Sequence, residues 1–233
     1  MNGRVRTPAL VLHTRALQEA DLIVECLGEK IGRFSVVARG ARKSQRRFGG
    51  PLELGTRLDV EVIVHPGRDL HGLRHCEVTV PLRAIREDLD RIIGLAYILE
   101  LVRHTAREGM ADPELYGLAV GIVDALEATP LIGEALILWE LALMAQAGHQ
   151  TSPLLLAHEA GFGPATTALF VRLAKGDPTA QLPEPAHQAM RAVLSRRWQE
   201  IIGRPLRSAQ LLNAAASGLS AAAHFPHAQN EVN

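Results

Sequence analysis

The sequence has few aromatic residues and few cysteines, and each shortage excludes a class of protein. Aromatic side chains make up 4% of the 233 residues, and residues 1–80 contain only Phe34 and Phe48. Tight stacking on nucleic-acid bases needs several aromatic platforms, so the sequence disfavours that mode of binding. Cys26 and Cys76 could form at most one disulfide, which excludes a disulfide framework and indicates a reducing compartment.

Long hydrophobic runs are also lacking. No apolar stretch approaches the roughly 18 residues of a membrane helix, and residues 1–15 do not contain the apolar stretch of a secretory signal. Hydrophobic residues make up 47% and charged residues 21% of the chain, which is typical of a globular protein with a real core. We therefore expect a soluble, cytoplasmic protein without a membrane partner.

Catalytic signatures are missing as well. The chain has no P-loop, dinucleotide-binding fingerprint, nucleophile elbow or paired zinc motif. His65, His71, His75 and Cys76 do gather around one expected hairpin, and this composition is typical of metal ligands. However, His75 and Cys76 are neighbours and would point to opposite faces of a strand. We interpret the group as scattered histidines and expect no catalytic residue, metal or cofactor. A hydrolase that depends on His71 or His75 is the alternative.

The sequence does contain two regions of different periodicity. Five short segments rich in Val, Leu and Ile predict strands, and the clearest is 58–64, which alternates along its length. Five strands in about 80 residues suit a small closed barrel, because closure removes exposed edges. From Pro81 onward the apolar spacing is helical, with helices expected over 89–106, 112–128, 130–148, 163–177 and 183–206. The prediction is an α+β protein with a barrel at 1–80 and an all-α domain at 81–233, fraying from about residue 216.

Charge is sorted along a chain whose formal net charge is zero. Residues 1–80 hold 13 basic and 9 acidic residues, whereas residues 81–233 hold 12 and 16. Five cations fall within residues 39–47, and no acidic residue interrupts 30–52. A solvated loop is the simple interpretation, but this density also fits a surface for nucleic-acid phosphates, held without reading sequence. Phe48 could stack on a base, whereas Phe34 is expected in the core.

Several motifs resemble the bacterial recombination mediator family RecO. These are the phrase R-x-x-x-E-x-D formed by Arg15, Glu19 and Asp21, the Gly-Arg turn that follows, the stretch ARGARKSQRR at 38–47 and the closing stretch RRWQEIIGRPLRSAQLL at 196–212. The resemblance covers most of the chain in the same order. For Arg15, Glu19 and Asp21 themselves, a structural salt bridge is expected, with contact to a partner as the alternative.

The resemblance implies a fold and a function. It implies an oligonucleotide-binding barrel followed by a helical domain, in a non-catalytic protein of DNA repair at the nucleoid. Such a protein binds single- and double-stranded DNA, anneals complementary strands and, with RecR, helps to load RecA onto DNA coated by single-strand-binding protein, whose acidic C-terminal tail it binds. We predict that DNA is bound by Arg33, Arg39, Arg42, Lys43, Arg46, Arg47 and Phe48. The alternative is an RNA-binding or ribosome-associated barrel protein.

A second basic group lies near the end of the chain. It could be a solvated helix face, an extension of the DNA surface or a clamp for an acidic peptide. Its members are Arg191, Arg196, Arg197, Arg204 and Arg207.

The sequence departs from the resembled family at one place. Many members carry a four-cysteine zinc site in the helical region, but the corresponding stretch at 147–163 has no cysteine, and His149 and His158 cannot make a closed site alone. We expect that stretch to be held by packing, with Leu154, Leu155, Leu156 and Phe162 as the candidates.

Overall fold

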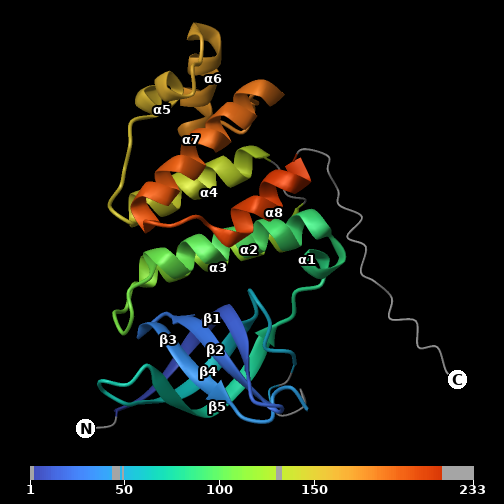
Figure 1. The fold of residues 1–233 in the computed structure, drawn as a ribbon, viewed down its shortest axis with the longest axis vertical. Coiled ribbons are helices and arrows are strands. Elements are labelled where there is room, and N and C mark those ends of the chain that lie inside the picture. Colours follow the sequence, from blue (N-terminus) through green and yellow to red (C-terminus); the bar gives the residue numbers. More distant parts are fainter. Residues whose placement is uncertain (1–2, 44–47, 49, 130–132, 217–233) are drawn as a thin grey trace, which may run out of the picture.

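The protein consists of a barrel with a stack of helices above it (Figure 1). The computed structural model describes residues 3–43, 48, 50–129 and 133–216. The elements are β1 (Gly3–Leu17), β2 (Asp21–Gly28), β3 (Gly32–Ala38), β4 (Arg57–Val64), β5 (Leu70–Val80), α1 (Ala84–Glu87), α2 (Leu89–Thr105), α3 (Pro113–Ala128), α4 (Gly133–Gln146), α5 (Pro153–Glu159), α6 (Pro164–Ala174), α7 (Glu184–Ile202) and α8 (Arg207–Ala216). The expected fraying from about residue 216 concerns residues outside this description.

The five strands form the predicted closed barrel, in the order β1-β2-β3-β5-β4. The long strand β1 closes it, because its first half pairs with β4 and its second half pairs with β2. The remaining seam is a short parallel pairing of β3 with β5, at Ser35 with Leu70 and Val36 with His71. All other pairings are antiparallel. A five-stranded closed arrangement of this kind is the oligonucleotide-binding (OB) fold.

The barrel interior follows the alternation of its strands. On β3, Phe34, Val36 and Ala38 point inward and are buried, while the residues between them are partly exposed. These side chains share one core cluster with inward residues of the other strands, including Cys26 and Cys76, which are both unpaired thiols. The predicted core position of Phe34 is confirmed by its exposure of 2%.

The outer face of β2, and that of β1 around Leu10 and Leu12, are buried too, because the helical domain covers them. Leu10 and Leu12 of β1 and Leu27 of β2 belong to the core cluster of the helices and not to that of the barrel. Consequently the outer side of β2, which sequence alternation would assign to solvent, is almost fully enclosed. The two domains therefore share a continuous hydrophobic contact, with α2 and α3 nearest to the barrel (Figure 1).

The helices begin where the sequence provides capping side chains. Asp88 accepts hydrogen bonds from the backbone N–H groups of Asp90 and Arg91 at the start of α2. Asp112 accepts one from Leu115 N–H at the start of α3, with Pro113 in the first turn. These bonds satisfy amide groups that have no partner inside the helix.

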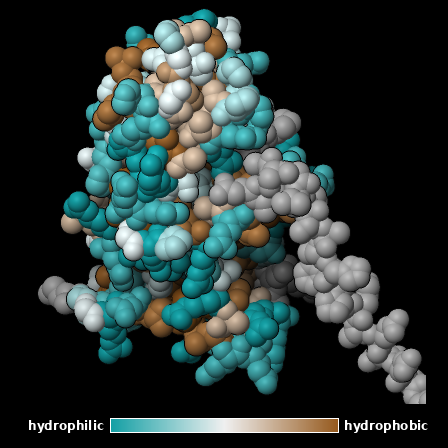
Figure 2. Space-filling view, turned by 45° about the horizontal axis from the view of Figure 1, so that its top comes forward, coloured by the Kyte–Doolittle hydropathy of each residue, from teal (hydrophilic) through white to brown (hydrophobic). Residues whose placement is uncertain are grey.

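Four large hydrophobic side chains on α2 and α5 are exposed, and for the two on α5 the prediction is wrong. Leu89 and Ile92, in the first turn of α2, are 63% and 40% exposed. Leu154 and Leu155, expected to pack in the cysteine-free stretch, are 61% and 49% exposed on α5. The space-filling view shows hydrophobic residues on the surface of that uppermost part of the molecule (Figure 2).

The cysteine-free stretch is instead held by one face of α5 and by an aromatic pair. Leu156 is fully buried, as predicted. Phe162 packs edge-on against Phe170 of α6, with ring centroids 6.0 Å apart. Among the described residues, no helix has the length and apolar character needed to span a membrane.

Candidate nucleic-acid interface

The basic segment, residues 39–47, leaves the end of β3 and is fastened to the turn between β1 and β2. The N–H of Gly40 donates to the Asp21 carboxylate at 2.8 Å, and the N–H of Arg42 donates to the carbonyl of Ala20 at 3.0 Å. Gly40 has φ 75°, a left-handed conformation that glycine adopts at no steric cost. The segment therefore starts from a fixed base.

The described cations of the basic segment point to the surface. Arg39, Arg42 and Lys43 are all exposed. One guanidinium nitrogen of Arg42 donates to the carbonyl of Gln18 at 2.9 Å, which holds this side chain over the β1–β2 turn. The other two predicted contacts, Arg46 and Arg47, lie outside the described residues.

Asp21 explains part of the R-x-x-x-E-x-D phrase. The predicted salt bridge is wrong, since no ion pair joins Arg15, Glu19 and Asp21 in the described part of the chain. The structural role falls to the hydrogen bond from Gly40 to Asp21, which joins the turn to the basic segment. Arg15 and Glu19 are exposed at the surface.

The predicted stacking role of Phe48 is not compatible with its position. Phe48 is 3% exposed and belongs to the barrel core, together with Ala41 and Leu52 of the same connection. Burial of these apolar side chains in the barrel core is more favourable than their exposure to water. The ring is therefore directed away from any DNA on the surface.

Arg33, also predicted to bind DNA, forms bonds within the protein instead. Its guanidinium donates to Glu25 Oε1 at 2.9 Å and to the carbonyl of Ala106 at 3.2 Å, and it lies 3.5 Å from Glu108. Arg103 of α2 binds the other carboxylate oxygen of Glu25. Burial raises the pKa of Glu25, but the hydrogen bonds and charges of the two arginines outweigh it and lower that pKa below its usual value. Arg33 thus joins the barrel to the helical domain.

The second basic group does not form one cluster. Arg197 binds Glu159 of α5 with nitrogen–oxygen distances of 2.5 and 3.1 Å, and Arg196 is exposed on α7. Arg191 lines a different cavity, near α4. Arg204 and Arg207 line one cavity together with Arg103, because the turn after α7 places them at the start of α8. Only this pair extends the basic surface toward the barrel.

The cavity that Arg204 and Arg207 line lies between the two domains and has a volume of about 510 Å³. Barrel residues form one wall, and α2 and α8 form the other. This interdomain cavity is lined by Leu12, His13, Leu54, Ala96, Glu100, Arg103, Arg204, Arg207, Ser208 and Leu211. Three arginines and one histidine face a single acidic residue there, so the cavity favours an anionic ligand.

The acidic residue of the interdomain cavity is fully engaged. Glu100 accepts hydrogen bonds from the N–H groups of Arg207 and Ser208, at 3.2 and 2.9 Å, and from the Ser208 hydroxyl at 2.5 Å. Burial raises the pKa of Glu100, but the hydrogen bonds from Ser208 and Arg207 lower it overall. Glu100 thereby caps the start of α8, and its charge is directed to these amides.

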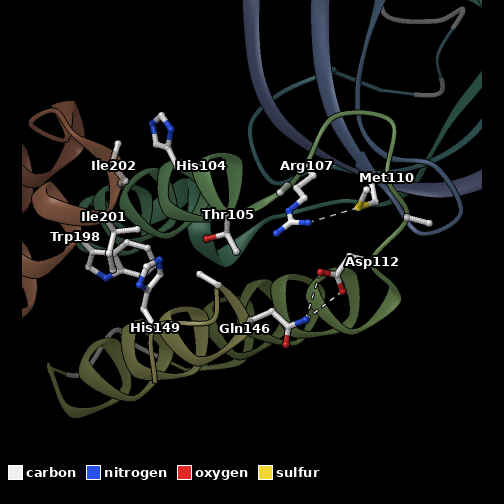
Figure 3. Close-up of a pocket in the computed structure, with 13 residues that line it drawn as sticks. His104, Thr105, Arg107, Met110, Asp112, Gln146, His149, Trp198, Ile201 and Ile202 are labelled. Atoms are coloured by element: carbon white, nitrogen blue, oxygen red, sulfur yellow. Dashed lines mark hydrogen bonds between the residues drawn. The ribbon is translucent and has the colours of Figure 1, made fainter. Parts of the chain in front are cut away.

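A second cavity, of about 480 Å³, opens in the helical domain beside Trp198 (Figure 3). Ile201 and Ile202 of α7 lie beside Trp198, His104 and His149, while Arg107, Asp112 and Gln146 lie farther from α7 (Figure 3). The carboxylate of Asp112 accepts from Gln146 there, at 3.2 and 3.4 Å. This cavity mixes an apolar surface with nitrogen-bearing side chains of His104, Arg107 and His149.

The histidine group near β5 shows no metal-binding geometry. The N–H of His65 donates to His71 Nδ1 at 3.4 Å, and His75 lies 3.9 Å from Glu77. Burial raises the pKa of Cys76 to about 12, so this thiol stays protonated. Within the described ranges, no set of three or more His, Cys, Asp or Glu side chains is placed to hold a metal ion.

Comparisons with known proteins agree with this architecture. Residues 1–82 match the family model "Recombination protein O N terminal", and residues 86–152 match "Recombination protein O C terminal". Together these two models cover well over half of the chain. The chain belongs to the RecO family. The first match coincides with the barrel, and the second covers α2, α3 and α4.

Curated relatives of the RecO family are similar over the same part. The DNA repair protein RecO of Anaeromyxobacter sp. (strain K) is 41% identical over 145 residues, which is 62% of this chain and 57% of the relative. RecO of Geobacter sulfurreducens is 39% identical over 123 residues, covering 53% and 50% of the two chains. RecO of Myxococcus xanthus is 35% identical over 140 residues, covering 60% and 57%. The chain thus spans a little over half the length of the relatives it matches.

Proposed function

We propose that this protein is a non-catalytic, DNA-binding mediator of recombinational DNA repair. It binds single- and double-stranded DNA, anneals complementary strands and, with RecR, helps to load RecA onto strands coated by single-strand-binding protein. It acts in the cytoplasm, at the nucleoid. The observation that carries the proposal is the exposure of Arg39, Arg42 and Lys43, whose backbone is anchored on an OB barrel, in a chain of the RecO family.

The basic segment supports binding of the phosphate backbone. Arg39, Arg42 and Lys43 are exposed, and Asp21 and Ala20 fix the backbone that carries them. Cations held this way displace the counterions of DNA, which provides affinity without base recognition. Arg46 and Arg47 follow closely in the sequence and belong to the proposed contact surface.

The burial of the aromatic side chains of the barrel supports binding to both single-stranded and double-stranded DNA. Phe34 and Phe48 are buried, so the described part of the barrel offers no phenyl ring for stacking on bases. Proteins selective for single strands depend on such stacking. Contact with phosphates alone holds single strands and duplexes alike, which suits annealing, because the bases stay available for pairing.

Features of the helical domain support the proposal that it binds protein partners. Residues 108–171 contain eight acidic residues and no lysine or arginine, so this middle region does not compete for DNA. The cavity beside Trp198 combines the apolar Ile201 and Ile202 with Arg107 at its edge (Figure 3). An acidic peptide with apolar residues, such as the tail of single-strand-binding protein, matches this chemistry. RecR is proposed to bind on the barrel side.

The test is fluorescence anisotropy of labelled single-stranded DNA, duplex DNA and structured RNA, each titrated across salt. We expect comparable affinity for both DNA forms at low salt and a steep loss as salt rises. Preferential binding of structured RNA would favour a ribosome-associated role instead. Absence of DNA binding at low salt would refute the proposal. An annealing assay on strands coated by single-strand-binding protein, with and without RecR, then tests the mediator role.

A further inference from the structure

A bulge in β1 turns two basic side chains to the outside of the barrel. The pairing of β1 with β2 shifts between Val11 and His13, which leaves Leu12 as the extra residue. Leu12 enters the core of the helical domain, whereas His13 and Arg15 pair with Glu25 and Ile23 and share their outward face. His13 and Arg15 are exposed and lie about 7 Å apart along the strand.

His13 joins this strand to the interdomain cavity. It lines the cavity together with Arg103, Arg204 and Arg207. Partial burial lowers the pKa of His13, and the charges of Arg103, Arg15 and Arg207 lower it further. Arg103 of α2 and Arg207 at the start of α8 thus line the same cavity as His13, and His13 itself is neutral at pH 7.

Arg15 continues toward the basic segment at the other end. The strand beyond Arg15 ends at Leu17, and the next residue, Gln18, accepts the guanidinium of Arg42 on its carbonyl oxygen. Asp21, beside this turn, holds the N–H of Gly40. The cations thus follow one another from α8 along β1 to the basic segment.

The acidic residues along this path are already bound. Glu25 is enclosed between Arg33 and Arg103, and Glu100 caps α8. Asp21 accepts from Gly40. Glu19, in the turn, is an exposed acid beside the described part of the path, and Glu53, next to Leu54 of the interdomain cavity, is exposed but pairs with Arg86. The sum of charges along it is therefore positive.

We propose that these residues form one continuous track for a nucleic-acid backbone, running from Arg42 and Lys43 over Arg15 of β1 to Arg204 and Arg207 at the interdomain cavity. The inference rests on the proposed function and extends its site from the barrel to the helical domain. Arg15, within the R-x-x-x-E-x-D phrase, becomes a DNA-contacting residue, and the pair Arg204 and Arg207 becomes the far end of the site.

An extended polyanion fits this arrangement better than a short acidic peptide. A peptide in the interdomain cavity would use Arg103, Arg204 and Arg207 but would leave Arg15 and the basic segment without a ligand. A DNA strand carries one negative charge per nucleotide and can contact every cation along the path. The track also avoids the outer face of β2, which the helical domain covers.

The test compares Arg15→Ala and Arg207→Ala with a matched control, Arg172→Ala. Arg172 is an exposed arginine on α6, in the part of the molecule furthest from the barrel (Figure 1), and it pairs with Asp177. Neither Arg15 nor the side chain of Arg207 caps a helix, so folding should survive, which thermal unfolding checks. Binding is measured by anisotropy on a single strand of about 30 nucleotides, well above the ~4–16 nucleotides one OB barrel holds.

We expect Arg15→Ala and Arg207→Ala each to weaken DNA binding several-fold. Each should also lower the slope of log affinity against log salt concentration by about 0.7, because one phosphate of the single strand is no longer neutralised. Arg172→Ala should change neither. If both track variants bind like the unaltered protein while loss of the basic segment abolishes binding, the track is refuted and the proposed function stands. If the unaltered protein binds no DNA, the proposed function itself fails.

A peptide with an acidic, apolar C-terminus provides the competing outcome. If Arg207→Ala no longer binds that peptide but keeps its affinity for DNA, the interdomain cavity is a protein-binding site and the track is refuted. Should the peptide bind equally to Arg207→Ala and to the unaltered protein while DNA binding falls, the track is supported.

Discussion

Glu25 of the barrel and Arg103 of α2 are joined through a single carboxylate oxygen. Arg103 Nε and Nη2 lie 2.8 and 2.6 Å from Glu25 Oε2, while Oε1 is left to Arg33. Glu25 is only 7% exposed, so its charge depends on these two partners. This pair places α2 against the barrel at a defined position and thereby sets the interdomain cavity that Arg103 lines.

Removal of this carboxylate should weaken the contact between the domains. In Glu25→Ala, Arg33 and Arg103 lose their common acceptor in a partly buried place. We expect the free energy of unfolding to fall by about 2–3 kcal/mol, below the roughly 3–5 kcal/mol of a fully buried pair because both arginines are partly exposed. Urea unfolding measures it. The matched control is Glu61→Ala, which removes a partly exposed pair with Arg74 at 3.5 Å, and its loss should stay within about 0.5 kcal/mol. Equal losses in both variants would contradict the role of Glu25.

Phe48 should matter for stability and not for DNA contact. Because its ring fills the barrel core, Phe48→Ala should lower the free energy of unfolding by about 3–5 kcal/mol. Phe48→Leu retains most of the apolar volume and should cost less. At a temperature where both variants are folded, the salt slope of DNA binding should equal that of the unaltered protein. A selective loss of single-strand affinity in Phe48→Leu, with normal stability, would restore the stacking role.

The barrel and most helices could be predicted because their periodicity is local. The alternation of β4 and the caps at Asp88 and Asp112 are contained in neighbouring residues. The site was harder to predict, because Arg33 and Phe48 look like a surface cation and a loop aromatic in the sequence, whereas tertiary packing engages both side chains. Glu25 and Ala106, which hold Arg33, are 8 and 73 positions away.

The same limit explains the second basic group. In the sequence, Arg204 and Arg207 look like Arg196 and Arg197. They lie on a different part of the surface because the turn after α7 changes the direction of the chain between the two pairs. Gly203, at φ 75°, ends α7 and turns the chain toward α2. The glycine signalled where the helix ends. That Arg103, about 100 residues earlier, lies beside Arg207 depends on the packing of α2 against α8, which no local pattern contains.

Neutralising the basic segment should reduce the electrostatic part of DNA affinity. Arg42, Lys43, Arg46 and Arg47 changed together to alanine or glutamine should weaken binding at low salt and flatten its salt dependence. The slope should fall by about 0.7 for each phosphate of a single strand that the variant no longer neutralises. Anisotropy across a salt series measures it. Substitution of Arg68 and Arg74, on the β4–β5 side of the barrel, is the control, and an unchanged slope in the four-residue variant would remove the basic segment from the interface.

Glu140 should make the stability of the helical domain depend on pH. It is buried at 1% exposure and accepts a hydrogen bond from Tyr97 at 2.9 Å. Burial raises its pKa to about 7, against which Arg191 and Tyr97 act only partly. The folded state therefore keeps a proton between about pH 4.5 and 7 that the unfolded state has released. Over that range the free energy of unfolding falls as pH rises, by about 1.4 kcal/mol per unit at most, and above about pH 7 the contribution is constant.

Glu140→Gln isolates this contribution, because glutamine resembles the protonated acid in shape and can accept from Tyr97. At pH 5 the variant and the unaltered protein should unfold at similar urea concentrations. At pH 8 the variant should be more stable by about 1–3 kcal/mol, since only the unaltered protein then buries a charged carboxylate. Glu87→Gln, an exposed position on α1, is the control and should show no difference that depends on pH. A stability difference between Glu140→Gln and the unaltered protein that is the same at both pH values would mean that the carboxylate stays in one protonation state throughout.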